Sequence, residues 1–152
     1  MPANPEQTSS PLSVGDLWKG CELLARSPQM FTSAISSCTI ESDAGGRMIR
    51  SITFQQGQAE EMKQEIILTD MHKFDCITLE TGNRVTTIIF RGVTDSPQDL
   101  YLSLEYSIPY GQNSTEGLDG EKFRAMYTER AKRNLVDGLK TIRQLKLDGK
   151  LH

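Results

Sequence analysis

Residues 119–147 read DGEKFRAMYTERAKRNLVDGLKTIRQLKL, and this stretch decides the fold. Apolar side chains recur in it at intervals of three and four, which is the spacing of one face of an α-helix. They are Phe123, Met126, Tyr127, Ala131, Leu135, Leu139, Ile142 and Leu145. At 1.5 Å per residue the predicted helix is about 40 Å long, Gly138 is its only weak position, and Gly149 supplies a common helix end. A helix of this length can cover the width of a small sheet with one apolar face.

A series of short strands precedes this helix. The hydrophobic period changes to two after residue 37, and glycine-containing turn sequences recur at short intervals. The predicted strands are Ser37–Glu41, Arg47–Phe54, Met62–Thr69, Phe74–Glu80, Arg84–Gly92 and Leu100–Ile108. Short connections favour antiparallel neighbours. Before the strands, an N-cap signal at Ser13 and a stop before Pro28 predict a first short helix, and residues 29–36 predict a second.

Together these elements predict an α+β fold with one domain, which suits a length of 152 residues. Residues 1–12 are polar and contain proline, so we expect a leader in which residues 5–10 form at most a frayed edge strand. Residues 13–152 form the domain, in which a curved antiparallel sheet wraps around the long helix. We expect the space between sheet and helix to hold a small, largely apolar molecule.

Composition argues against several classes of partner. The net charge is -3 and the pI is about 5.4, with Lys and Arg scattered outside the last helix, so we expect no nucleic-acid partner. No apolar run is long enough to span a membrane and no signal-peptide pattern opens the sequence, which predicts no membrane insertion and a cytoplasmic location. The spacing of the three cysteines, and of His72 and His152, fits no zinc or other metal site. We therefore expect no metal.

Three stretches carry a resemblance to a known family. They are LSVGDLWKGCELLARSPQMF at residues 12–31, RMIRSITFQQG at residues 47–57 and TIRQLKLDGKL at residues 141–151. Together they resemble the AtaL-like branch of the START and Bet v 1-like (SRPBCC, helix-grip) superfamily, whose members are often found near fungal secondary-metabolite genes. The resemblance implies a hydrophobic cavity between sheet and long helix and no cofactor. Members of this superfamily usually open with a strand before the helix pair, which only the polar leader can supply here.

Arg50 is the first candidate for a catalytic or ligand-binding residue, because it shares a strand face with the apolar Met48, Ile52 and Phe54. If that face points inward, the guanidinium needs a carboxylate or an anionic ligand group as partner. Glu65 on the next strand is the nearest candidate, although a one-residue shift in register would place it on the other face. The two residues form either a structural cross-strand pair, or a catalytic pair in which Arg50 grips a carboxylate or enolate oxygen and Glu65 is the general base.

Tyr106 alternates with Leu100, Leu102 and Leu104 and is expected to face the interior. It is either a core residue or a group that orients a ligand carbonyl and donates a proton to it. A larger set of side chains, which could equally be plain core, is expected to line the ligand pocket. It comprises Trp18, Met48, Ile52, Phe54, Phe90, Leu104, Phe123, Met126, Tyr127 and Arg130.

Three functions remain open after these observations. The first is a cofactor-free enzyme of the cyclase, isomerase or dehydratase type, acting through Arg50, Glu65 and Tyr106 on a small hydrophobic intermediate of secondary metabolism. The second is a non-catalytic binding or carrier protein that uses the same pocket for an apolar or polyketide-like ligand. The third is an interaction protein, such as a homodimer formed through an exposed sheet edge.

Overall fold

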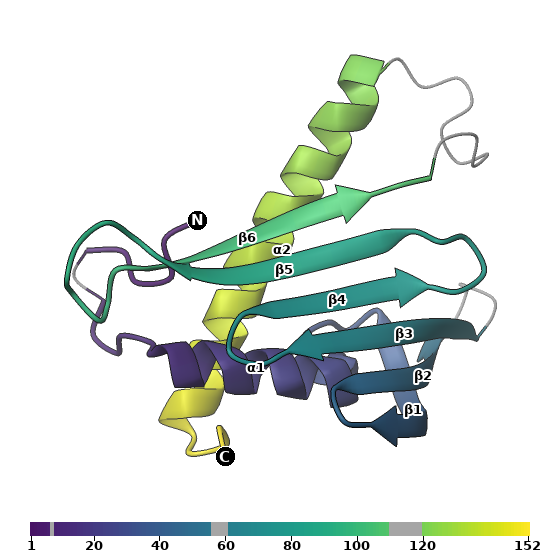
Figure 1. Ribbon diagram of the computed structural model, residues 1–152, viewed down its shortest axis with the longest axis horizontal. Coiled ribbons are helices and arrows are strands. Elements are labelled where there is room, and N and C mark those ends of the chain that lie inside the picture. The colour runs from purple at the N-terminus through teal and green to yellow at the C-terminus, as the bar shows by residue number, and fades with distance from the viewer. Residues whose placement is uncertain (7, 56–60, 110–119) are drawn as a thin grey trace.

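Six antiparallel strands form one curved sheet in the computed structural model, which describes residues 1–6, 8–55, 61–109 and 120–152 (Figure 1). The strands are β1 (Ile35–Ala44), β2 (Arg47–Phe54), β3 (Met62–Thr69), β4 (Lys73–Thr78), β5 (Arg84–Arg91) and β6 (Leu100–Ser107). Their spatial order follows their order in the chain. Short connections therefore produce a simple meander, as the sequence predicted.

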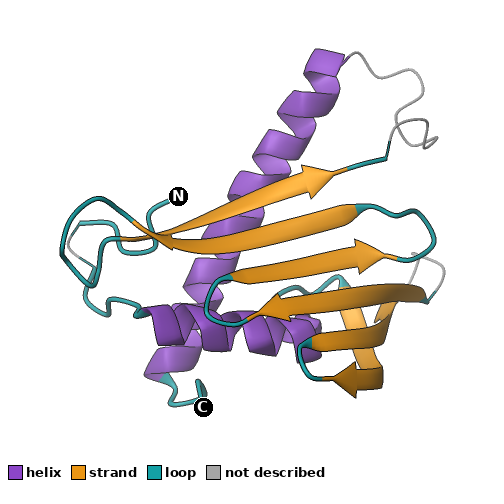
Figure 2. Cartoon of the chain, in the orientation of Figure 1, coloured by secondary structure: helices purple, strands orange, loops and turns teal. Residues whose placement is uncertain are grey.

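Two α-helices lie on one face of this sheet, behind it in the view of Figures 1 and 2. Helix α1 (Val14–Arg26) begins with a capping box, in which Ser13 and Asp16 satisfy each other's backbone N–H groups. Helix α2 (Gly120–Leu147) is the long helix, and its first turns extend past β6 (Figure 1). The architecture is α+β and consistent with a helix-grip arrangement.

The second predicted helix is largely absent. A single 3-10 turn, η1 (Pro28–Met30), follows α1, and the strand β1 already begins at Ile35. Ile35 pairs with Phe54 of β2, so residues that carry a helical apolar spacing extend the edge strand instead. Cross-strand pairing has here overridden a weak helical pattern.

One hydrophobic core fills the space between the helices and one end of the sheet. It combines residues of α1, the sheet and the second half of α2, including Leu17, Trp18, Cys21, Ala25, Met48, Ile66, Phe74, Ile89, Leu102, Leu139 and Ile142. The two helices approach closely at Gly20, where an added Cβ would lie 2.4 Å from the Cδ1 of Ile142. Glycine at this position allows α1 and α2 to pack against each other.

Within the described ranges no helix is long and apolar enough to cross a membrane.

Residues 1–3 lie beside β6 and extend the sheet by a short bridge. The amino group of Met1 donates to the Leu102 carbonyl (2.8 Å), and the amide of Ala3 donates to the Leu100 carbonyl (2.7 Å). Pro2 and Tyr101 form the antiparallel bridge between them. The extra sheet pairing is made by residues 1–3, whereas the described part of the predicted edge strand, residues 5, 6 and 8–10, has no strand assignment.

Candidate ligand-binding face

The face of the sheet that looks toward the helices consists of two parts with different exposure. Cross-strand pairing aligns inward side chains of all six strands on this concave face. One part is buried under α1 and the second half of α2. The other part, which we call the distal half, is only half-buried and consists of Phe54, Met62, Thr78, Val85, Leu104 and Tyr106. Four of these six side chains are apolar, so the distal half presents apolar surface that the described core does not cover.

The first turns of α2 place one aromatic ring against Tyr106 of the distal half and a second ring against the first. The ring of Tyr127 meets Tyr106 edge-on with a centroid distance of 4.9 Å, and Phe123 lies 4.6 Å from Tyr127. Arg130 covers the Tyr127 ring at 5.1 Å from its centroid, which is a cation–π contact. Residues that the sequence predicted to line one pocket are therefore adjacent, although they come from β6 and α2.

Tyr106 has an available hydroxyl hydrogen. The side-chain amide of Asn134 donates to its phenolic oxygen at 2.8 Å, and the hydroxyl hydrogen has no acceptor among the residues that the structure describes. Burial raises the pKa of the phenol, more than the positive charge of Arg130 and the Asn134 hydrogen bond lower it. The hydroxyl is thus protonated at neutral pH and can donate a hydrogen bond or a proton to an acceptor on this face. Nothing in the sequence pattern pointed to Asn134, because it follows a turn of exposed Lys and Arg residues.

Arg50 lies on the concave face and is 4% exposed, and its hydrogen-bond partners are uncharged groups of the chain. Its Nη1 donates to the carbonyl oxygens of Leu24 (2.7 Å) and Ala25 (2.6 Å) in the last turn of α1. Its Nε and Nη2 donate to Oε1 of Gln64 (2.9 and 2.7 Å), and Nη2 lies 3.9 Å from the sulfur of Cys76. The expectation of a carboxylate partner is therefore wrong, because two carbonyls, an amide oxygen and a sulfur are the partners of the guanidinium. The unpaired carbonyls and the negative end of the helix dipole meet the guanidinium instead.

Glu65 lies on the opposite, convex face of the sheet. The register pairs Arg50 with Gln64 and pairs Glu65 with Ile49, and the Glu65 carboxylate forms an ion pair with Arg47. The predicted Arg50–Glu65 pair is wrong because neighbouring residues of a strand point to opposite faces. A general base at Glu65 beside Arg50 is ruled out by this register.

The remaining predicted lining residues divide into three groups. Trp18, Met48 and Ile52 are buried, and Phe54 and Leu104 belong to the distal half. Phe90 was predicted incorrectly: it is 43% exposed on the convex face, where its ring stacks on Tyr101 with centroids 5.5 Å apart. Met126 was also predicted incorrectly, because it is 41% exposed on the outer side of α2. The apolar stripe predicted for α2 therefore includes residues, such as Met126, that do not face the sheet.

The convex face contains a buried carboxylate that the sequence analysis did not single out. Asp75 is fully buried and accepts hydrogen bonds from Arg84 (3.0 Å) and Thr86 (2.6 Å), while Lys73 lies 3.1 Å away. Burial raises the pKa of Asp75, but these hydrogen bonds and charges lower it more, to about 2. Asp75 is thus a structural anion that joins β4 to β5.

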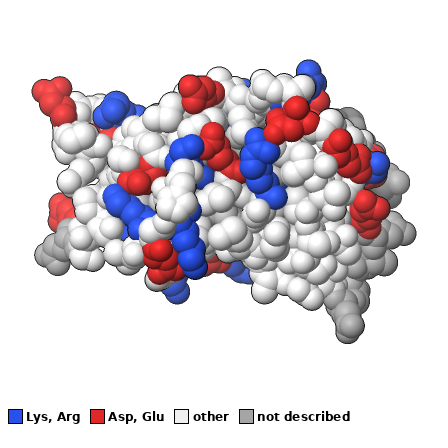
Figure 3. Space-filling model, turned by 90° about the horizontal axis from the view of Figure 1, so that it is seen from below, with Lys and Arg blue, Asp and Glu red and all other residues white. Residues whose placement is uncertain are grey.

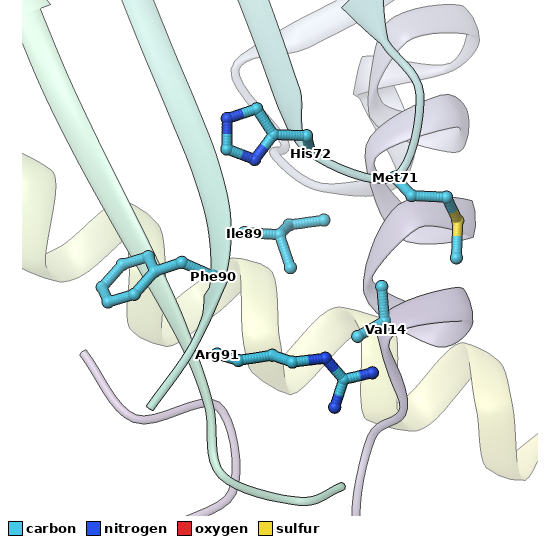
Figure 4. A pocket seen from close by; sticks show the side chains of 6 residues that line it. All are labelled: Val14, Met71, His72, Ile89, Phe90 and Arg91. Carbon is cyan, nitrogen blue, oxygen red and sulfur yellow. The ribbon is translucent and has the colours of Figure 1, made fainter. Parts of the chain in front are cut away.

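An open depression of about 390 Å³ lies at the other end of β5 from the distal half (Figure 4). The depression is lined by Val14, Met71, His72, Ile89, Phe90 and Arg91.

In Figure 3, which shows the molecule from below, basic and acidic side chains alternate across the visible face without a patch of a single sign. The described residues also include no group of three His, Cys, Asp or Glu side chains placed to hold a metal ion. Burial raises the pKa of Cys21 to about 12 and raises that of Cys76, so neither thiol is activated.

A family model described as "AtaL: Acetylaranotin biosynthesis cluster protein L" matches residues 1–149. The chain belongs to the AtaL family. This family takes its description from a biosynthetic gene cluster, which is compatible with a role of the chain in secondary metabolism. No curated protein matches the sequence. The AtaL match covers both helices, all six strands and the distal half, so every residue of the candidate site lies within it.

Proposed function

We propose that this AtaL-family chain is a helix-grip domain of the START and Bet v 1-like superfamily that binds a small, largely apolar molecule of secondary metabolism. The ligand lies between the distal half of the concave face and the first turns of α2. The observation that carries the proposal is the half-buried apolar surface of the distal half, which includes Tyr106, whose hydroxyl donates to none of the described residues. Ligand sites of proteins commonly combine an apolar wall with a few placed polar groups.

The driving force for binding is the removal of this apolar surface from water. Phe54, Met62, Val85 and Leu104 are all half-buried and share the concave face. Each Å² of apolar surface removed from water stabilises a complex by about 25 cal/mol. Covering roughly 200 Å² of protein surface and as much of ligand surface contributes about 10 kcal/mol before the entropic cost of association. After an association cost of about 4 kcal/mol, about 6 kcal/mol remains, which corresponds to a Kd of some tens of micromolar for a compact apolar compound.

Specificity comes from Tyr106. Asn134 donates to the phenolic oxygen, so the hydroxyl group can donate its own hydrogen bond to a different acceptor. On an apolar surface the fitting acceptor is a ligand carbonyl, since a phenol left without a partner by an apolar ligand is penalised. The preferred ligand is therefore an apolar compound that carries a carbonyl group.

The proposal is tested with 1,6-diphenylhexatriene, an apolar probe whose fluorescence increases on leaving water. The wild-type chain should bind the probe with micromolar affinity. Leu104→Arg, which places a charge on the distal half, should weaken binding at least tenfold. Glu105→Arg is the matched control, because Glu105 is the next residue and is exposed on the convex face, and it should leave binding unchanged. Equal binding by the two variants would exclude the distal half as the site.

A second candidate function is a cofactor-free enzyme acting at the same place. The raised pKa of Tyr106 favours it, because a protonated phenol beside a ligand carbonyl can act as a general acid. If the chain is an enzyme, the variant Tyr106→Phe should affect turnover much more than binding. Its affinity for a substrate that the wild type converts should fall at most tenfold, and its turnover of that substrate should be at least a hundredfold slower. Mass spectrometry of small molecules that co-purify with the chain supplies the compounds to test.

A further inference from the structure

Gln64 is a buried amide on the concave face whose two ends have unequal partners. Its side chain is 8% exposed and pairs across the sheet with Arg50. The oxygen Oε1 accepts two hydrogen bonds from Arg50, at 2.9 Å from Nε and 2.7 Å from Nη2. The nitrogen Nε2 carries two hydrogens, and its acceptor among the described residues is the thioether sulfur of Met62 at 3.6 Å. A thioether is a weak acceptor, so the amide nitrogen is under-satisfied for a group this buried.

The orientation of this amide is set by Arg50. The guanidinium is held in place by the Leu24 and Ala25 carbonyls at the end of α1, and its remaining N–H groups require an acceptor from Gln64. The amide oxygen must therefore face Arg50, which turns the NH2 group toward Met62. Met62 belongs to the distal half, so the weakly bonded NH2 group of Gln64 is directed toward the proposed ligand site.

We propose that Gln64 is a second hydrogen-bond donor to the ligand and that Arg50 is its positioning residue. This inference rests on the proposed function and narrows the class of ligand. Gln64 is on β3 and Tyr106 is on β6, three strand spacings or about 14 Å apart at the backbone. Both side chains project inward from a curved sheet and both present hydrogen-bond donors. The ligand is an elongated apolar compound with at least two acceptor oxygens, such as a diketone.

The variant Gln64→Glu separates this role from a purely structural one. A glutamate keeps an oxygen acceptor for Arg50 and adds an opposite charge, so the support of α1 is retained. It replaces the NH2 group by an oxygen that repels a ligand carbonyl. A structural role alone therefore predicts an unchanged protein, whereas the proposed role predicts a loss of affinity for oxygen-bearing ligands.

The experiment compares two fluorescent probes of similar length, curcumin with its two carbonyl groups and the hydrocarbon 1,6-diphenylhexatriene. Gln64→Glu should raise the Kd of curcumin about tenfold and leave the Kd of diphenylhexatriene within twofold. Tyr106→Phe should show the same selectivity at its own end of the site. Urea unfolding of each variant checks that it is folded, and Gln64→Met, which also removes the donor, gives the same prediction if the glutamate is not tolerated.

The outcomes distinguish the two proposals. If the wild-type chain binds neither probe, the proposed function fails and the role of Gln64 fails with it. If both probes bind and the Gln64 variants weaken neither of them, or weaken both equally, the role of Gln64 is wrong while the site at the distal half stands. A selective loss of curcumin supports both the donor role of Gln64 and the ligand class.

Discussion

Replacing Arg50 by methionine should destabilise the fold strongly, because the guanidinium satisfies several buried acceptors at once. Methionine fills a similar volume without any donor, so the carbonyls of Leu24 and Ala25 and the oxygen of Gln64 all lose their Arg50 hydrogen bonds. A buried acceptor without a partner costs about 1–3 kcal/mol. Three of them cost about 3–9 kcal/mol, and about 2 kcal/mol is recovered because a charge no longer has to be desolvated. The expected net loss is about 1–7 kcal/mol.

Urea unfolding followed by circular dichroism measures this loss. With a slope of about 1.5–2 kcal/mol per molar urea, the midpoint should fall by about 0.5–4.5 M. Arg26→Met is the matched control at the same end of α1. Its side chain is 49% exposed and pairs with Asp43 at 2.7 Å, so the change should cost less than about 1 kcal/mol. Equal midpoints for the two variants would refute the assignment of Arg50 to the end of α1.

Three further substitutions probe the convex face, the contact between the helices and an open position on α2. Asp75 has a folded-state pKa lowered from 3.8 to about 2, so its stabilisation is complete above pH 4 and is lost as the pH falls toward 2. Between pH 5 and pH 2 the wild-type free energy of unfolding should therefore fall by about 2 kcal/mol more than that of Asp75→Asn, and parallel pH profiles would contradict the assigned shift. Gly20→Ala should lower stability by about 1–3 kcal/mol through the clash with Ile142. Gly138→Ala, with nothing within 4 Å, should raise stability by about 0.5–1 kcal/mol; both are read from thermal unfolding, and the opposite order would show that α1 and α2 do not touch at Gly20.

Much of the secondary structure could be predicted because it depends on the hydrophobic periodicity of neighbouring residues. The bounds predicted for Arg47–Phe54 and Met62–Thr69 coincide with β2 and β3, since both strands alternate clearly and end at turns. The long helix was predicted to within one residue of α2 over its described part. The edge strand β1 was predicted too short, because its sequence alternates weakly and its length is set by pairing with β2.

The candidate site was harder to predict because it depends on distances between elements. Tyr106 was assigned correctly to the inward face by its alternation with leucines. Gln64 was missed, since a single glutamine in a strand gives no signal of its own. Its importance arises from Arg50, whose partners come from α1, 25 and 26 residues earlier in the chain.

The sequence by itself determined the α+β class, the six strands and the long helix, because hydrophobic period and turn chemistry act over a few neighbouring residues. Tertiary structure decided which of two adjacent residues, Gln64 or Glu65, meets Arg50. A shift of one residue in register exchanges the two faces of a strand. It also decided which part of the long helix is covered, because Met126 and Tyr127 share one stripe in sequence and only Tyr127 packs against Tyr106.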